Sequence, residues 1–287
     1  MTGRRPWPIH PAPLPGEALL SWLGRIAHCY SYTVADLLTC DLGITVREAE
    51  HLDVAAPSGL MAALSARTGQ PIDRIGRMTL SGGGSDVLDL KPIPVPWPRH
   101  RSYDRRRSFI QVTWDEVGLF DRIHACRACL AEAPMPWIRL AWRIPWIGSC
   151  PDHGLRLERA SILPGSLVFW DAPGSRAASE AMRAMDRLSM ATIEGEPQSQ
   201  GQNTPGKSRF GRLRCALEEL QTSLRTGIAH KTDAGEGALS GADGRRLASR
   251  PFELLSRPDQ LRMLELVAQK EVGVQSPSDK SAIHFEH

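Results

Sequence analysis

The sequence of 287 residues lacks the features of several special classes of protein. It has no apolar run near the ~18 residues that a membrane-spanning helix needs, and no continuous apolar segment follows Arg4 and Arg5 as it would in a signal peptide. It also lacks internal repeats and low-complexity tracts. We therefore expect a cytoplasmic protein with no membrane partner and, at roughly 150 residues per domain, about two domains.

The sequence also has little excess of one charge over the other, because it contains 35 Lys and Arg and 32 Asp and Glu. With a net charge of +3, the protein cannot coat nucleic acid through its overall charge, so any such contact must come from a local patch. The Pro-rich connector 91–107 is one candidate, since Asp104 is its only acid among several basic residues. We predict nucleic-acid contacts at Arg105, Arg106 and Arg107; the alternative is a solvated connector without a site.

The N-terminal part, residues 1–90, predicts a helical domain of helix-turn-helix type. Apolar spacing indicates a helix over 17–30, and Thr33 with Asp36 resembles a capping box that begins a helix over 33–40. Next, a helix ending at Gly69 precedes one over 71–79, with Pro71 at its first position.

The last of these helices carries basic residues suited to DNA. Arg74 and Arg77 stand beside Asp73, and we interpret them as candidate nucleic-acid contacts. The helix 33–40 contains Asp36 and no Lys or Arg, which favours a structural or protein-binding role.

The cysteines carry the clearest chemical signal. Cys126 and Cys129 form C-x2-C, and Cys150 and His153 form C-x2-H after twenty intervening residues. Two such pairs brought together complete a tetrahedral Cys3His site, so we predict one Zn²⁺ ion. Four protein ligands leave no open position for water, which favours a structural ion over a catalytic one.

Aromatic and aliphatic residues fill the segment between the two ligand pairs, and they allow two interpretations. We favour Trp137, Trp142 and Trp146 as a small core laid over the metal; the alternative is a platform on which single-stranded bases stack. The interleaved Arg139 and Arg143 could contact phosphate, or could pair with an acid such as Glu132 or Asp152.

The sequence thus predicts a mainly α protein with a small zinc-binding segment in the middle. After the connector, we expect a zinc-knuckle domain over 108–193, in which short strands are favoured up to about residue 170. Residues from 161 onward are helical by pattern, interrupted by a linker over 194–208. A helical C-terminal region over 209–270 then precedes a disordered tail over 271–287.

Three blocks of the sequence together resemble the TniQ family. They are P-x-P-L-P-G-E-x-L-x-S-W-L-x-R (Pro11 to Arg25), L-x-x-x-T-G-x-P (64 to 71), and C-x2-C-L-A-E with R-L-A-W-R-I-P-W and C-P-x-H-G-x-x-L (126 to 157). The resemblance covers roughly the first 160 residues. It places the zinc ligands of the family on Cys126, Cys129, Cys150 and His153, but only Cys215 follows this cluster, so the second knuckle of longer relatives is in doubt.

The resemblance implies a non-enzymatic accessory protein of bacterial DNA transposition that acts in target-site selection. Its expected partners are a transposition AAA+ ATPase, a DDE transposase, and target DNA met directly or through a guide-RNA complex, sometimes as a homodimer. The alternative is a stand-alone zinc-containing helix-turn-helix transcriptional regulator that reads a symmetric operator. A zinc hydrolase would need an open coordination site and placed carboxylates, which the sequence does not supply.

Overall fold

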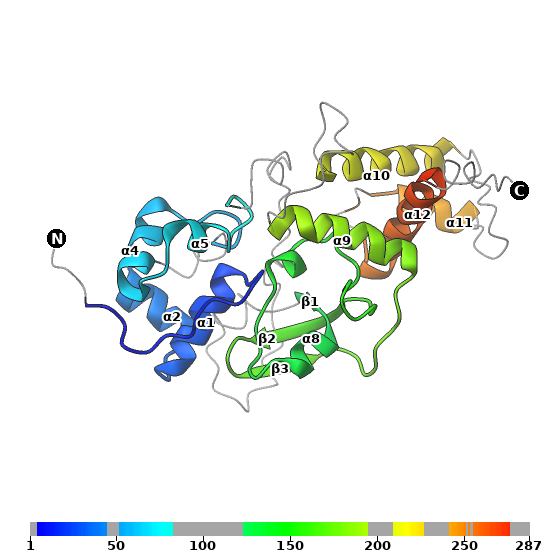
Figure 1. The fold of residues 1–287 in the computed structure, drawn as a ribbon. Helices are drawn as coiled ribbons and strands as arrows, with labels where there is room; N and C mark the ends of the chain where they lie inside the picture. The colour runs from blue at the N-terminus through cyan, green and yellow to red at the C-terminus, as the bar shows by residue number, and fades with distance from the viewer. Residues whose placement is uncertain are drawn as a thin grey trace, which may run out of the picture.

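A computed structural model of the chain describes residues 5–44, 52–82, 123–194, 209–226, 241–250, 252 and 255–275. The described chain is mainly helical, as the sequence predicts, with one small antiparallel sheet. Figure 1 shows the N-terminal helices, the sheet and the C-terminal helices following one another across the molecule. The connector 91–107, with Arg105, Arg106 and Arg107, lies outside the described residues.

The N-terminal part is built from short helices. They are α1 (Leu19–Cys29), α2 (Val34–Asp36), the π-helix η1 (Leu37–Leu42), α4 (Ser58–Thr68) and α5 (Ile72–Gly76). The capping box of Thr33 and Asp36 is confirmed, and the chain leaves η1 at Gly43 with a left-handed φ of 70°.

The prediction for α5 is wrong in two details. Pro71 has an extended ψ of 139° and caps the helix instead of forming its first turn, and the helix ends at Gly76 rather than at residue 79. The α4 and α5 helices contact each other across the turn at Gly69. Their interpretation as a helix-turn-helix stays a prediction.

The middle of the chain forms a three-stranded sheet in the order β1 (Ile123–Ala125), β2 (Glu158–Leu163) and β3 (Leu167–Trp170). Helix α8 (Arg127–Glu132) and the 3-10 helix η2 (Leu140–Arg143) lie between β1 and β2 in the sequence. The expectation of short strands up to about residue 170 is confirmed, whereas the helical pattern from residue 161 is wrong up to Trp170. Ile162, Val168 and Phe169 belong to a β-hairpin in which Ser161 faces Phe169, and β-branched and aromatic residues suit such strands.

Four helices complete the described chain. They are α9 (Glu180–Glu194), α10 (Arg209–Thr226), α11 (Gly241–Ala248) and α12 (Arg257–Gln275). The spacing of Phe210, Leu213, Leu217, Leu220 and Leu224 predicts one apolar face of α10, and the structure confirms it, because the first four are buried and Leu224 is half-buried. The prediction of a disordered tail from residue 271 is wrong up to Gln275, where α12 ends, and the rest of the predicted tail lies outside the described residues. The predicted linker 194–208 lies outside the described residues except for Glu194, the last residue of α9.

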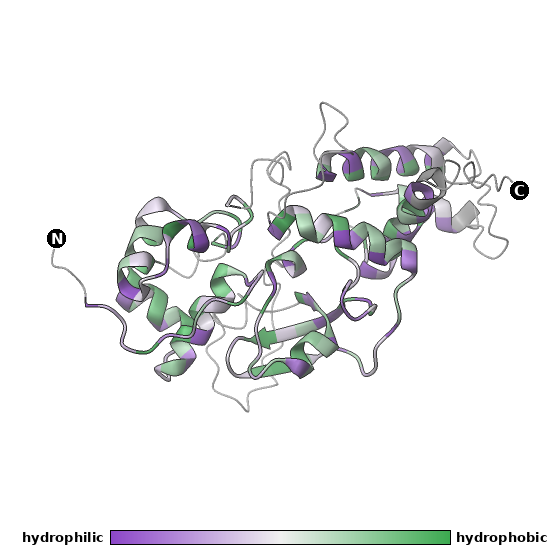
Figure 2. Ribbon diagram, in the orientation of Figure 1, coloured by the Kyte–Doolittle hydropathy of each residue, from purple (hydrophilic) through white to green (hydrophobic). Residues whose placement is uncertain are grey.

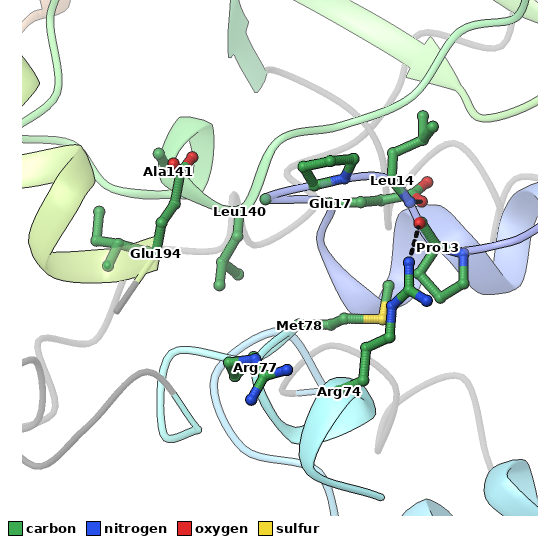
Figure 3. A pocket seen from close by; sticks show the side chains of 12 residues that line it. Pro13, Leu14, Glu17, Arg74, Arg77, Met78, Leu140, Ala141 and Glu194 are labelled. Carbon is green, nitrogen blue, oxygen red and sulfur yellow. Dashed lines mark hydrogen bonds between the residues drawn. The ribbon is translucent and has the colours of Figure 1, made fainter. Parts of the chain in front are cut away.

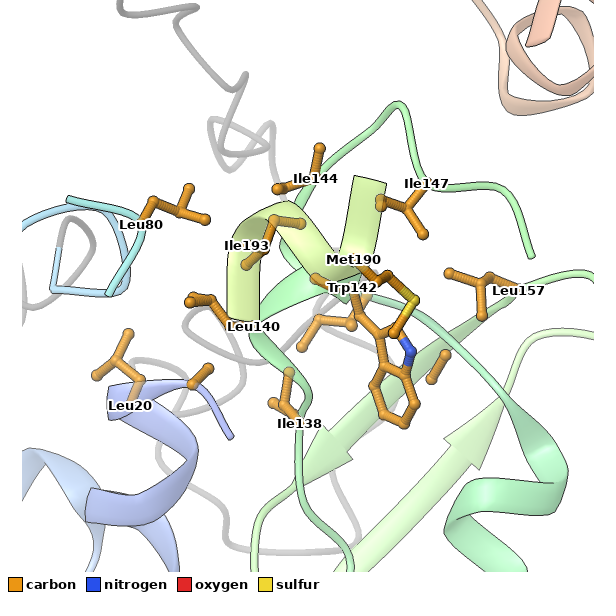
Figure 4. Close-up of a cluster of buried hydrophobic side chains, with 14 of the residues drawn as sticks. Leu20, Leu80, Ile138, Leu140, Trp142, Ile144, Ile147, Leu157, Met190 and Ile193 are labelled. Carbon is orange, nitrogen blue, oxygen red and sulfur yellow. The ribbon is translucent and has the colours of Figure 1, made fainter. Parts of the chain in front are cut away.

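A continuous hydrophobic core joins these elements. Figure 4 shows Leu20 and Leu80 from the N-terminal part converging with Ile138, Leu140 and Trp142 from the middle and with Met190 and Ile193 from α9. Figure 2 shows the hydrophobic and hydrophilic residues alternating along the helices, as amphipathic helices require. The core interpretation of the tryptophans is confirmed, because Trp137, Trp142 and Trp146 are all buried.

The motif around Glu17 is a buried polar network that fixes the start of the chain. Arg25 makes a two-pronged ion pair with Glu17, at 2.9 Å for both Nε and Nη2, and Ser21 donates to the same carboxylate at 2.8 Å. Burial raises the pKa of Glu17, although the bonds from Arg25 oppose that shift. The Ser21 hydroxyl accepts the Ile138 N–H at 2.9 Å, so this motif also binds the middle segment.

In the described part of the chain, no helix combines the length and the apolar composition that crossing a bilayer requires.

Candidate metal centre

The first pair of candidate ligands lies where a strand passes into a helix. Strand β1 ends at Ala125, Cys126 caps α8, and Cys129 lies within the first turn of that helix. The neighbouring thiols of Cys129 and Cys150 lower the pKa of Cys126, the N–H groups of Cys129 and Ala128 add a smaller effect in the same direction, and burial opposes the shift. The cluster thus favours a thiolate at Cys126, the form that binds metal.

The second pair lies on a tight turn between η2 and β2. The Gly154 N–H donates to the Cys150 carbonyl at 2.9 Å, and the Cys150 N–H donates to the Leu155 carbonyl at 2.8 Å. Gly154 has a left-handed φ of 65°, and a Cβ there would lie 3.3 Å from the Arg183 guanidinium carbon. Glycine lets the turn close so that Cys150 and His153 face the same point.

The four side chains meet in one cluster. His153 Nδ1 lies 3.7 Å from Cys126 Sγ, 3.3 Å from Cys129 Sγ and 3.5 Å from Cys150 Sγ. The sulfurs of Cys129 and Cys150 are 3.6 Å apart, and all six cysteines of the chain are free thiols. The four ligand atoms lie within 4.8 Å of one another, and they could hold a metal ion.

These separations fit a tetrahedral ion. With bonds of about 2.3 Å to sulfur and about 2.0 Å to nitrogen, neighbouring ligand atoms of a tetrahedron lie about 3.5–3.8 Å apart. Four of the six separations, at 3.3–3.7 Å, are close to these edges, and all six are within 4.8 Å. A disulfide would require about 2.05 Å between two sulfurs, which this cluster does not approach.

A carboxylate outside the cluster orients the histidine. Glu132, the last residue of α8, has its Oε1 3.0 Å from His153 Nε2. With Nε2–H donated to Glu132, Nδ1 turns its lone pair toward the thiols, which is the arrangement that metal-bound histidines commonly use. The helix that carries Cys129 therefore also sets the ring of His153.

A buried acid and a buried base hold the backbone that leads to Cys150. Asp186 of α9 accepts hydrogen bonds from the N–H groups of Gly148 (3.1 Å) and Ser149 (2.7 Å), and Arg257 of α12 donates to the carbonyls of Pro145 and Ile147, each at 2.7 Å. Burial raises the pKa of Asp186 to about 7, although these bonds and Arg257 oppose it. The C-terminal helices thereby position the second ligand pair.

Sequence comparison identifies the family. The model of the TniQ family matches residues 8–157, slightly more than half of the chain. The chain belongs to the TniQ family. This membership implies an accessory role associated with transposition, in a family whose domain is not catalytic. No curated protein and no solved structure matched the chain.

The residues that the TniQ match covers include all four members of the metal cluster and the Glu17 network. Within the described ranges, the cluster is the only group of three or more His, Cys, Asp or Glu side chains close enough to share an ion. The region matched to the family thus contains both the Glu17 network and the candidate metal centre of this chain.

The two arginines between the ligand pairs make ion pairs within the TniQ chain. Arg139 lies 3.0 Å from Asp152, one of the two acids that the sequence suggested, whereas Arg143 pairs with Asp53 at 2.8 Å. Asp53 is a long-range partner that sequence reasoning missed, because 90 residues separate it from Arg143. Its other carboxylate oxygen accepts the Leu20 N–H at 2.8 Å, so it joins α1 to η2.

Of the predicted nucleic-acid contacts, Arg74 and Arg77 lie within the described residues. Arg74 and Arg77 are both exposed at or just after α5. Arg74 donates to the Pro13 carbonyl at 2.9 Å and to Gln70 Oε1 at 3.1 Å, so its guanidinium helps to hold the N-terminal arm. Contact of either residue with nucleic acid stays a prediction.

Proposed function

We propose that this protein selects target sites in bacterial DNA transposition, as a non-enzymatic adaptor between the target and the transposition machinery. It bridges target DNA, or a guide-RNA complex, to an AAA+ ATPase and a DDE transposase. The observation that carries the proposal is the family match over residues 8–157. A stand-alone operator-reading regulator is not favoured, because the family is one of transposition.

The ion that this cluster would bind is zinc, in a structural role. Three thiolates and one imidazole form a soft, tetrahedral ligand set that suits Zn²⁺ and disfavours Mg²⁺ or Ca²⁺. Cys126, Cys129, Cys150 and His153 fill all four positions, which leaves none for a reacting water. When bound, the ion supplies a cross-link between β1, α8 and the turn before β2, and its binding energy becomes folding energy.

Direct contact with DNA is assigned to the basic connector, with Arg105, Arg106 and Arg107 facing phosphates. The support is compositional: these consecutive arginines stand in a segment with only one acid, Asp104. Contacts with phosphates would position the protein on DNA without specifying a sequence. Sequence choice would then come from the partners.

Fluorescence anisotropy of the zinc-loaded protein with a random ~40-bp duplex at several salt concentrations tests this assignment. We expect log affinity to fall linearly with log salt. Changing Arg105, Arg106 and Arg107 together to Ala should reduce that slope by roughly 2.7, at about 0.9 per phosphate contact.

A matched control changes three arginines outside the connector, Arg159, Arg176 and Arg187, to Ala, and it should leave the slope unchanged. Equal slopes for the connector variant and the wild type would contradict contact through the connector. Negligible binding at low salt would instead indicate an adaptor that meets DNA only through its partners.

A further inference from the structure

A small pocket lies where three parts of the chain meet. Its lining comes from the N-terminal arm at 13–17, from α5 and the residues after it, and from η2 with the end of α9. Figure 3 shows Arg74 and Arg77 on one side of the pocket and Leu140, Ala141 and Glu194 on the other. Its volume is about 150 Å³, below the roughly 300–1,000 Å³ of sites for drug-sized ligands, so it fits a side chain or two and not a cofactor.

The α5 side of the pocket presents an available positive charge. Arg77 caps the C-terminus of α5, is exposed, and makes no ion pair with any residue that the structure describes. Arg74 beside it is held by the Pro13 carbonyl and Gln70. An exposed guanidinium at the edge of this pocket, with no ion pair to a described residue, favours a carboxylate or phosphate ligand.

The opposite side presents a carboxylate. Glu194 lines the pocket at the end of α9, with Oε1 3.9 Å from Arg139 Nε. A phosphate backbone brings only acceptors, so it could meet Arg77 but would offer no donor to Glu194. A peptide brings both an acidic side chain for Arg77 and backbone N–H donors for Glu194, and the apolar walls of Met78, Leu140 and Ile193 suit a branched aliphatic side chain.

We propose that this pocket binds a short extended segment of a partner protein, in which an acidic residue is followed by a branched aliphatic one. The carboxylate of the segment accepts from Arg77, its aliphatic side chain packs on Met78, Leu140 and Ile193, and a backbone N–H donates to Glu194. The proposal rests on the adaptor function, and it names the chemistry by which the adaptor captures one partner. Because the walls come from α5 and α9 together, the bound segment would contact the N-terminal and the middle parts at once.

The test is a methyl NMR titration of the full-length protein, labelled with ¹³C at its methionine methyl groups. Met78 lines the pocket, and its signal is assigned with Met78→Leu. The probe is the dipeptide acetyl-Asp-Leu-amide, and the matched probe without the charge is acetyl-Asn-Leu-amide. For a ligand this small, we expect a saturable shift of the Met78 signal with a Kd on the order of 1 mM for the Asp dipeptide.

Arg77→Gln should weaken binding of the Asp dipeptide about tenfold, because it removes a charge-assisted hydrogen bond. Arg187→Gln, which removes an exposed arginine of α9 outside the pocket, should leave binding unchanged. Equal binding of the Asn dipeptide, or no effect of Arg77→Gln, would overturn the proposal. A shift of Met78 caused by duplex DNA and lost in Arg77→Gln would also overturn it and assign the pocket to nucleic acid.

The dipeptide titration contains no transposition partner, and it measures neither the zinc affinity nor the DNA affinity of the protein. The dipeptide can therefore fail to bind while the connector still binds DNA, and it can bind in a protein whose connector does not. The failure of the pocket proposal is in this way distinguishable from the failure of the adaptor function.

Discussion

Cys126→Ser is expected to abolish the cooperative unfolding transition of the middle segment, and removal of zinc by a chelator should do the same. Apparent binding energies of structural zinc are about 10–16 kcal/mol in small domains, whereas a whole domain is stable by only about 5–15 kcal/mol. The loss of one thiolate also leaves two cysteines and a histidine facing each other without an ion. Near-UV circular dichroism during thermal unfolding measures the effect.

The matched control is Cys29→Ser, because Cys29 is exposed at the end of α1 and far in sequence from the cluster. It should melt as the wild type does. A metal-free protein that keeps the full cooperative transition would contradict a structural ion.

Arg143→Met is expected to destabilise the protein by about 3–5 kcal/mol, because it leaves a buried charge without its partner. The Asp53 side chain is 2% exposed and lies 2.8 Å from Arg143, whose side chain is 9% exposed. Burial already raises the pKa of Asp53, and the attraction of Arg143 is the largest effect that opposes this. Chemical denaturation of the zinc-loaded protein measures the loss.

Two further variants separate the buried charge from simple loss of packing. Adding Asp53→Asn to Arg143→Met should recover part of the stability, since Asn is neutral and its oxygen can still accept the Leu20 N–H. Arg159→Met breaks an ion pair with Asp171 whose members are 42% and 49% exposed, so it should cost at most about 1 kcal/mol. Similar costs for Arg143→Met and Arg159→Met would refute the buried-pair account.

The parts of the structure that the sequence predicts are those set by neighbouring residues. The ligand spacing of Cys126, Cys129, Cys150 and His153 reflects two local turns, and the cap of Thr33 and Asp36 spans three residues. The apolar face of α10 likewise follows from the periodicity of one helix. Such features need no knowledge of the tertiary fold.

The parts that could not be predicted depend on distant partners. Asp53 finds Arg143 across 90 residues, and Asp186 supports the backbone at Gly148 and Ser149 from a separate helix. The sequence left Glu132 and Asp152 as equal partners for Arg139, but the structure gives Asp152 to Arg139 and Glu132 to His153. The sequence favours short strands up to about residue 170, but their pairing and register depend on neighbouring strands and could not be predicted from local composition.

The measurement that tests the central claim most directly is zinc K-edge X-ray absorption on the purified protein, combined with a determination of its zinc content per chain. The account predicts one zinc per chain with three sulfur neighbours at about 2.3 Å and one nitrogen neighbour at about 2.0 Å. Cys150→Ser should lower both the occupancy and the sulfur count. An oxygen ligand in the first shell of the wild-type protein, or zinc well below one ion per chain, would contradict a closed structural centre built from Cys126, Cys129, Cys150 and His153.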